Sequence, residues 1–171
     1  MRRYVAFLRG ISPMNAKMSE LKRCFELAGF TNVKTVLASG NVVFDSPLKS
    51  VSQIERQAES AIAKHLGRNF YTIVRPVAVL NRIIKNDPYS AFDLPDKARR
   101  VVTFRRKPDK QVNSLPLELD GARILLADRC EIFTAYVPTG RGPAFMTLIE
   151  KTFGRALTTR TWETVKKCAK A

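Results

Sequence analysis

The sequence has little histidine and little cysteine. His65 is its single histidine, and its three cysteines, Cys24, Cys130 and Cys168, are far apart. Zinc sites that use several imidazole ligands are therefore excluded. An odd number of scattered cysteines also favours reduced thiols over a disulfide framework. We expect no metal site and no cofactor.

Long hydrophobic runs are also lacking. No apolar stretch approaches the roughly 18 residues that a membrane-spanning helix needs. The apolar stretch at residues 4–8 has five residues and is followed by Arg9 and Gly10, so it is shorter than the signal-peptide core of about 7–15 residues. These features predict a cytoplasmic protein with no membrane contact.

Acidic residues are half as frequent as basic ones. The 171 residues hold 30 Lys and Arg against 15 Asp and Glu, which gives a net charge of +15. Residues 1–23 carry six basic and one acidic side chain, residues 97–110 seven and one, and residues 155–171 five and one. If these segments meet in the fold, their field would collect phosphates. The alternative is a dispersed charge that only aids solubility.

Hydrophobic periodicity predicts a mixed fold in the first half. Strands are expected over 4–8, 33–38, 42–44 and 71–74, and helices over 18–28 and 51–66. The resulting order, β-α-β-β-α-β, is typical of a ferredoxin-like plait, an antiparallel sheet with two helices on one face.

We expect the same order to repeat in the second half. Strands are expected over 101–104, 123–126, 132–137 and 156–158, with helices over 108–115, 143–153 and 162–169. We therefore predict an α+β fold of two tandem ferredoxin-like plaits with an extra C-terminal helix. The predicted boundaries are 1–78 for the first plait, 79–97 for a linker with a short helix, and 98–171 for the second plait and the last helix.

The aromatic residues do not favour base stacking. RNA-binding proteins of this fold stack bases on exposed aromatic side chains of the sheet. No Lys/Arg-Gly-Phe pattern is present, and Phe7, Phe44 and Phe104 are expected to be buried. Binding of a nucleic acid would then depend on charge.

Four segments carry a resemblance to a known family: Leu8-Arg9-Gly10-Ile11, residues 17–21, residues 39–44 and residues 158–162. Together they resemble the bacterial domain of unknown function 1697 over nearly the whole chain. The resemblance implies tandem α/β plaits and no established activity. The family usually continues its first loop with Asn-Val-Gly-Gly, whereas this chain has a shorter and stiffer segment that begins at Ser12.

Two segments are candidate anion sites. Gly140, Arg141 and Gly142 precede a predicted helix, where glycines permit close backbone approach and the helix N-terminus attracts anions. Thr159 and Arg160 come just before the last predicted helix. The alternatives are a plain strand-to-helix turn for the first segment and simple docking of the last helix for the second.

Three further residues complete these hypotheses. Thr161 is expected to cap the last helix, and Trp162 to belong to its apolar face. Arg9 leaves the first strand beside Gly10, and we expect it to point toward the region of Arg160.

Ser39-Gly40-Asn41 predicts a tight hairpin turn that uses a positive φ at Gly40 or Asn41. No nucleophile elbow surrounds Ser39. No catalytic constellation is recognisable elsewhere, so an enzyme is not the favoured interpretation.

Three functions remain open. The leading hypothesis is a basic binding protein for a phosphate-bearing partner, with nucleic acid first. Its alternative is the binding or catalysis of a small molecule, or of a phosphometabolite, in the cleft between the plaits. The third is a protein-interaction module without a ligand. The sequence leaves the oligomeric state open.

Overall fold

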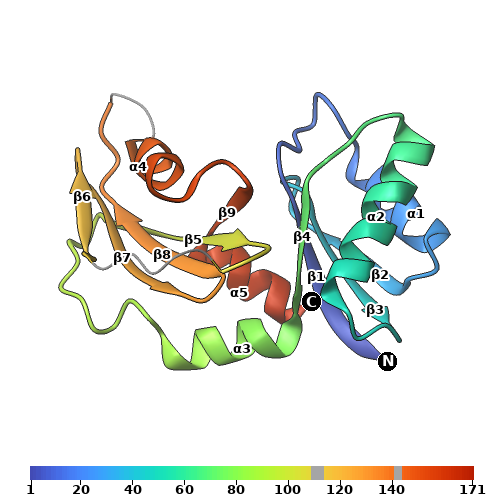
Figure 1. Cartoon of the computed structure of the whole chain (residues 1–171), viewed down its shortest axis with the longest axis horizontal. Helices are drawn as coiled ribbons and strands as arrows, with labels where there is room; N and C mark the ends of the chain where they lie inside the picture. Colours follow the sequence, from blue (N-terminus) through green and yellow to red (C-terminus); the bar gives the residue numbers. More distant parts are fainter. Residues whose placement is uncertain (109–113, 141–143) are drawn as a thin grey trace. The chain divides into compact units, whose positions relative to one another are not determined.

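The computed structural model describes residues 1–108, 114–140 and 144–171. These residues form an α+β protein with two antiparallel sheets, of four and five strands, and five helices (Figure 1). The elements are β1 (Arg2–Leu8), α1 (Met18–Leu27), β2 (Thr31–Val36), β3 (Asn41–Ser46), α2 (Val51–Leu66), β4 (Thr72–Pro76), α3 (Val77–Asn86), β5 (Arg99–Arg105), β6 (Leu117–Leu119), β7 (Ala122–Asp128), β8 (Glu131–Tyr136), α4 (Ala144–Phe153), β9 (Leu157–Thr161) and α5 (Trp162–Lys170).

The chain forms two compact units. The first comprises Met1–Arg82 together with Thr164–Ala171, and the second comprises Ile83–Glu163. The end of the chain is fastened within the first unit, because Arg3 Nη2 and Lys34 Nζ both donate to the oxygen of Ala171, at 3.2 and 2.9 Å. The predicted boundaries, 1–78, 79–97 and 98–171, stay a prediction.

The sheet of the first unit has the strand order β2-β3-β1-β4. Apolar side chains on one face of this sheet pack against α1 and α2. In each helix the buried residues recur every three or four positions, so they lie on the side that faces the sheet. The helix ends follow from sequence: the hydroxyl of Ser50 accepts from Gln53 N at the start of α2, and Gly67, with φ of +62°, ends it. Phe25, Phe30 and Phe44 form the centre of this core, with ring centroids 4.6 to 5.7 Å apart.

The β2–β3 connection contains the predicted turn residues. Gly40 has φ of +75°, and its carbonyl accepts from Leu8 N at 2.9 Å. Asn41 is fully buried, and its Nδ2 donates to Val36 O and to Ser39 Oγ, at 2.8 and 3.0 Å. The Asn41 side chain thereby satisfies backbone and hydroxyl oxygens that the turn would otherwise leave unpaired.

The sheet of the second unit has the strand order β6-β7-β8-β5-β9. Helix α4 packs on one face through Leu148, Ile149 and Phe153, against Ile124 and Ile132 of the sheet. On the same face, Tyr136 stacks on Phe145 at 4.3 Å between ring centroids.

Strand β6 was absent from the sequence-based prediction. It forms a hairpin with β7 through Asp120 and Gly121, whose φ values are +46° and +79°. A two-residue Asp-Gly loop between apolar segments is a strong hairpin signal, so the sequence did carry the information.

The predicted helix over 108–115 falls mainly on residues 109–113, which lie outside the described part. Its described residues, Pro108, Ser114 and Leu115, are not helical. In the ranges that the structure covers, no helix is long and apolar enough to cross a membrane.

Candidate functional site

The start of β5 brings two of the basic segments side by side. β5 pairs with β8 on one side and with β9 on the other, and Val101 lies opposite Thr161 in the β5–β9 pair. The basic segment 97–110 contains β5 and the basic segment 155–171 contains β9, so the described parts of these two segments lie next to each other in the sheet. Segment 1–23 belongs to the first unit.

A pocket lies where β5 and α5 begin. It has a volume of about 470 Å³ and is lined by Ala98, Arg99, Arg100, Thr161, Trp162 and Glu163; we call it the β5–β9 pocket. Arg99, Arg100 and Glu163 are all exposed. The lining holds two guanidinium groups and one carboxylate, so its net charge is positive. The N-terminus of α5, which is the positive end of the helix dipole, adds to the positive potential.

Trp162 is the aromatic residue that lines the β5–β9 pocket, and Tyr89 packs against it. The ring of Trp162 is 3% exposed and meets the ring of Tyr89 edge-on, at 5.2 Å between centroids. Tyr89 is held in turn by its hydroxyl, which donates to Val101 O at 2.7 Å. Arg100 lies over the Tyr89 ring, with Cζ 5.6 Å from the centroid. The base of the pocket is thus rigid, and one of its two cations is held against it.

Burial dominates the ionisation of Tyr89. The apolar surroundings raise the pKa of its hydroxyl far above the ordinary value; Asp87 raises it further, while Arg100 opposes the shift. The hydroxyl is therefore a neutral donor at physiological pH.

The predicted residues on β9 have mixed placements. Thr161 is exposed and lines the β5–β9 pocket with Trp162. Arg160 is buried, and its Nη1 donates to Thr158 Oγ1 and Thr159 O, both at 2.8 Å. The hydroxyl of Thr159 shares a 2.8 Å hydrogen bond with that of Thr103. The pocket lining thus has Arg99 and Arg100 where the sequence suggested Arg160.

Arg9 and Gly140 are not among the described residues that line this pocket. Arg9 belongs to the first unit, where its N–H donates to Tyr71 O at 2.8 Å. Gly140 is exposed, with open space around the position of a Cβ. Arg141 and Gly142 lie outside the described residues.

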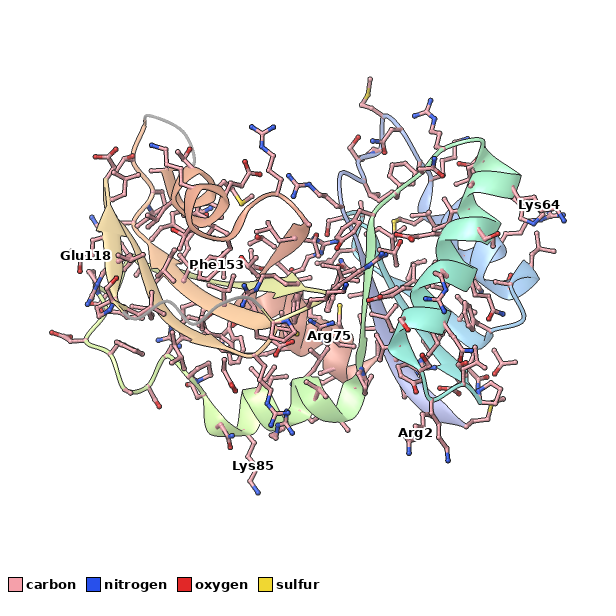
Figure 2. The ribbon with its side chains drawn as sticks, in the orientation of Figure 1. Arg2, Lys64, Arg75, Lys85, Glu118 and Phe153 are labelled. Carbon is pink, nitrogen blue, oxygen red and sulfur yellow. The ribbon has the colours of Figure 1, made fainter. Side chains whose placement is uncertain are left out.

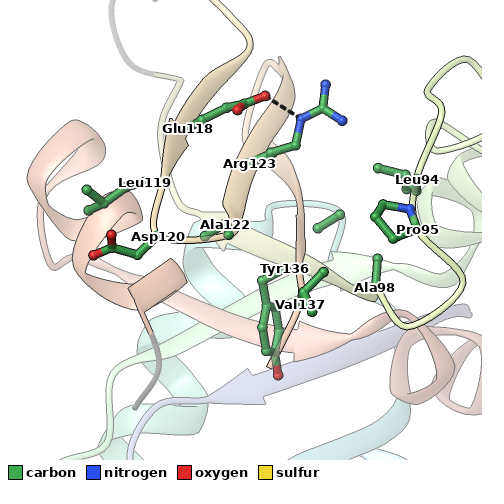
Figure 3. Close-up of a pocket in the computed structure, with 12 residues that line it drawn as sticks. Leu94, Pro95, Ala98, Glu118, Leu119, Asp120, Ala122, Arg123, Tyr136 and Val137 are labelled. Carbon is green, nitrogen blue, oxygen red and sulfur yellow. Dashed lines mark ion pairs between the residues drawn. The ribbon is translucent and has the colours of Figure 1, made fainter. Parts of the chain in front are cut away.

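A second pocket opens beside the first. It has a volume of about 420 Å³ and involves the β6–β7 hairpin, the end of β8 and the segment before β5; we call it the β6–β7 pocket. Figure 3 shows Leu94, Pro95 and Ala98 on one side of it and Ala122 and Arg123 on the other. Arg123 Nε lies 2.7 Å from Glu118 Oε1, so one carboxylate already neutralises this cation. Ala98 lines both pockets.

A basic cluster lies at the opposite end of β5. It consists of Arg105, Arg106, Lys107 and Arg129, and we call it the β5-end cluster. Arg105 is buried: its Cζ is 4.7 Å from the centroid of the Phe153 ring, and its Nη2 donates to Arg129 O at 2.9 Å. Lys107 and Arg129 are exposed.

Other basic residues are spread over separate elements. Arg2, Lys64 and Lys85 are exposed on β1, α2 and α3 (Figure 2). Much of the excess charge therefore lies outside both the β5–β9 pocket and the β5-end cluster.

The aromatic residues of the strands offer no platform for bases. Phe7, Phe44 and Phe104 are fully buried, as predicted. Within the described ranges, no three His, Cys, Asp or Glu side chains come together in a way that could hold a metal ion.

Sequence and structure comparisons give a family and a fold. The sequence model of the family described as "Protein of unknown function (DUF1697)" matches residues 1–122. No curated protein matches the chain. The solved structure of the conserved bacterial protein SP0830 from Streptococcus pneumoniae is similar, with a TM-score of 0.75 and 22% sequence identity, over 99% of this chain and 97% of that chain. At this identity the similarity concerns the fold.

Proposed function

Because the chain belongs to the DUF1697 family, whose description gives no activity, we propose from its site alone that it binds a phosphate-bearing small molecule in the β5–β9 pocket. The single observation that carries this proposal is the presence of two exposed arginines, Arg99 and Arg100, on the wall of a pocket of about 470 Å³. Pockets of roughly 300–1,000 Å³ suit small ligands, and guanidinium groups match phosphate oxygens bidentately.

Three features support this function. Neighbouring residues on one strand point to opposite faces, so Arg99 and Arg100 can approach a ligand from different directions. Trp162, which is buried against Tyr89, gives the pocket an apolar side, and an apolar surface beside a charge strengthens the attraction between the guanidinium groups and an anion. The hydroxyl of Thr161, which also lines the pocket, can donate to a phosphate oxygen.

A titration with inorganic phosphate tests this proposal. We expect saturable shifts of the backbone amide NMR signals of Arg99, Arg100 and Thr161 in the intact chain. Arg99→Gln should weaken binding about tenfold, because one charge-assisted hydrogen bond contributes roughly 1.5–3 kcal/mol. Arg56→Gln, a change on the exposed surface of α2, is the matched control and should bind like the wild type. Absence of saturable shifts, or equal binding by both variants, would refute the proposal.

A second function is favoured by the β5-end cluster. We propose that this cluster contacts the backbone of a nucleic acid, without reading its bases. Three of its side chains, those of Arg106, Lys107 and Arg129, are partly or fully exposed, while buried Arg105 fixes the turn that carries Arg129. Buried Phe7, Phe44 and Phe104 favour charge over stacking as the source of affinity.

Salt dependence tests the second function. Each contacted phosphate of a single strand contributes about −0.7 to the slope of log affinity against log salt. Affinity for a generic oligonucleotide should therefore fall steeply between about 50 and 200 mM salt. The double variant Lys107→Gln/Arg129→Gln should reduce that slope, whereas Lys64→Gln should leave it unchanged. Binding that is insensitive to salt would contradict this function.

We also propose that both units follow the ferredoxin-like plan. The strand order β2-β3-β1-β4 of the first sheet is repeated as β7-β8-β5-β9 in the second, with β6 added at the edge. The second unit differs in having α4 as its single described helix on the sheet face. An experimental structure with a helix over 109–113 on the α4 side would support a complete second plait; a strand or an extended segment there would argue against it.

A further inference from the structure

We propose that the β6–β7 pocket receives the apolar part of the ligand whose phosphate occupies the β5–β9 pocket. The ligand class is then a phosphate ester of a small apolar group. This inference rests on the proposed small-molecule function, and it is carried by the register of the second sheet, the small residues between the pockets and the distribution of charge.

The register places one arginine of each pocket on the same face of the sheet. Glu118 lies opposite Arg123, Arg123 opposite Ala135, and Ala135 opposite Arg100. Directly opposite residues of neighbouring strands point to the same face. This row therefore runs from the β6–β7 pocket, lined by Arg123, to the β5–β9 pocket, lined by Arg100, on the face opposite α4.

The sheet surface between Arg123 and Arg100 carries only small side chains. Arg123 and Arg100 are two strands apart, which corresponds to about 10 Å at a spacing of roughly 4.8 Å between strands. The residue between them is Ala135, and Ala98 and Gly121 are further small residues of the pocket lining. No long side chain rises from these three positions, so one ligand can reach both pockets.

Leu94 and Pro95 give the β6–β7 pocket an apolar side. Both precede β5 and lie beside Ala98 in the β6–β7 pocket (Figure 3). Together with Ala98 and Val137 they offer aliphatic surface in a volume of about 420 Å³. Because the alanine and glycine positions of the lining carry small side chains or none, an apolar group has room to contact this aliphatic surface.

Charge determines which end of the ligand enters which pocket. In the β6–β7 pocket the charge of Arg123 is offset by Glu118 at 2.7 Å, and Arg123 Nη1 donates to Asp93 O at 3.3 Å. The carboxylate of Asp120 also lines this pocket. Two carboxylates against one guanidinium disfavour a phosphate here, whereas the β5–β9 pocket has the reverse balance. The apolar group is thereby directed to the β6–β7 pocket.

A comparison of three probes tests the inference on the full chain at pH 8. The probes are inorganic phosphate, phenyl phosphate and phenol, so that the phosphate and the ring are presented separately and together. Phenyl phosphate should bind at least tenfold more tightly than inorganic phosphate, because its second contact is made within the same molecule. Its binding should shift the amide signals of Ala98, Ala122 and Val137 as well as those of Arg99 and Arg100.

One substitution separates the two pockets. Leu94→Glu places a carboxylate on the wall of the β6–β7 pocket, and it should abolish the tenfold gain of phenyl phosphate while the Kd of inorganic phosphate stays unchanged. Pro95→Glu, at an exposed position, is used if Leu94→Glu lowers the melting temperature. Arg56→Gln should keep the gain.

Each outcome decides the inference. If phenyl phosphate binds no better than inorganic phosphate, or if Leu94→Glu and Pro95→Glu both keep the gain, the ring does not occupy the β6–β7 pocket and the inference is overturned, while the proposed function stands. If neither phosphate compound binds, the proposed function fails and the inference fails with it.

Discussion

The guanidinium of Arg100 lies over the ring of Tyr89, with 5.6 Å between Cζ and the ring centroid. Tyr89 also contacts the rings of Trp162 and Phe133, at 5.2 and 5.9 Å between centroids. A buried aromatic cluster thus fixes one cation at the edge of the β5–β9 pocket. Because long arginine side chains lose much rotamer entropy when a ligand orders them, a cation that is already held binds an anion at a lower entropic cost.

Tyr89→Phe should make stability less sensitive to alkaline pH. Since the pKa of Tyr89 is raised in the folded state, the unfolded chain loses the phenolic proton first, and folding stability falls once the pH exceeds the ordinary tyrosine value of about 10. The variant lacks this contribution, so its free energy of unfolding should decline less between about pH 9.5 and 11.

At neutral pH, Tyr89→Phe should cost about 1 kcal/mol, because the hydrogen bond to Val101 O is lost. Urea unfolding at pH 7, 9.5 and 11 measures both effects. Tyr71→Phe, at a partly buried site outside this cluster, is the comparison variant. Parallel alkaline declines in the wild type and in Tyr89→Phe would contradict the assignment.

Asp45→Asn should destabilise the first unit at neutral pH. The amide of Asn32 donates to Asp45 Oδ2 at 2.6 Å, and Arg3 Nη1 pairs with Asp45 Oδ1 at 3.0 Å. The Asn32 hydrogen bond is the main reason that the pKa of Asp45 is lowered, with Arg3 adding to it against the effect of burial. The stability gained from this carboxylate is therefore present above the unfolded pKa of about 3.9 and is lost as the pH falls through the lower folded value.

Asp45→Asn should lower the free energy of unfolding by about 1 kcal/mol at pH 7, which is the size expected for hydrogen bonds and an ion pair that are partly exposed to water. This difference from the wild type should shrink toward pH 3. Asp96→Asn, at an exposed loop position, should have little effect at either pH. Urea midpoints at pH 7 and pH 3 provide the measurement. An equal loss for Asp45→Asn at both pH values would show that the charge of Asp45 contributes nothing.

Gly40→Ala should be more destabilising than Gly29→Ala. Both glycines have a positive φ, +75° and +86°, which costs an L-residue about 1–2 kcal/mol. A Cβ on Gly40 would also lie 2.8 Å from Ile11 Cβ, whereas a Cβ on Gly29 would meet open space. The added overlap should cost a further 1–3 kcal/mol or so, and the difference between the two variants isolates it.

Denaturant unfolding of both glycine variants is the measurement. Similar losses would mean that the loop of Ile11 moves aside, and the close approach of the first loop to the β2–β3 turn would then have no energetic importance.

Glu163→Gln should strengthen phosphate binding. Glu163 lines the β5–β9 pocket with Arg99 and Arg100, so its carboxylate opposes a bound anion. Neutralising it should lower the Kd of inorganic phosphate about twofold to fivefold at low salt, since an exposed charge contributes up to about 1 kcal/mol. The gain should shrink at high salt.

The control for Glu163→Gln is Glu26→Gln, at an exposed position on α1. It makes the same change in net charge away from the pocket. If both variants raise affinity equally, the effect comes from the overall charge of the protein and not from the pocket.

Local patterns in the sequence determined most of the helices and strands. Helix α2, for example, is marked by apolar residues at helical spacing, by Ser50 before it and by Gly67 after it, and each of these signals acts over a few residues. The Asp120-Gly121 turn carried an equally local signal for β6, which the prediction missed. The resemblance to the DUF1697 family, read from four short segments, was confirmed.

Only the tertiary structure decided which basic residues share a site. Thr161 and Trp162 were singled out in the sequence, but Arg99 and Arg100 become their neighbours through the pairing of β5 with β9, more than 50 residues apart. The same pairing leaves Arg160, one residue before Thr161, buried against Thr158. Helical periodicity and turn residues fix local backbone shape, whereas the register between distant strands depends on how the whole sheet buries its apolar faces.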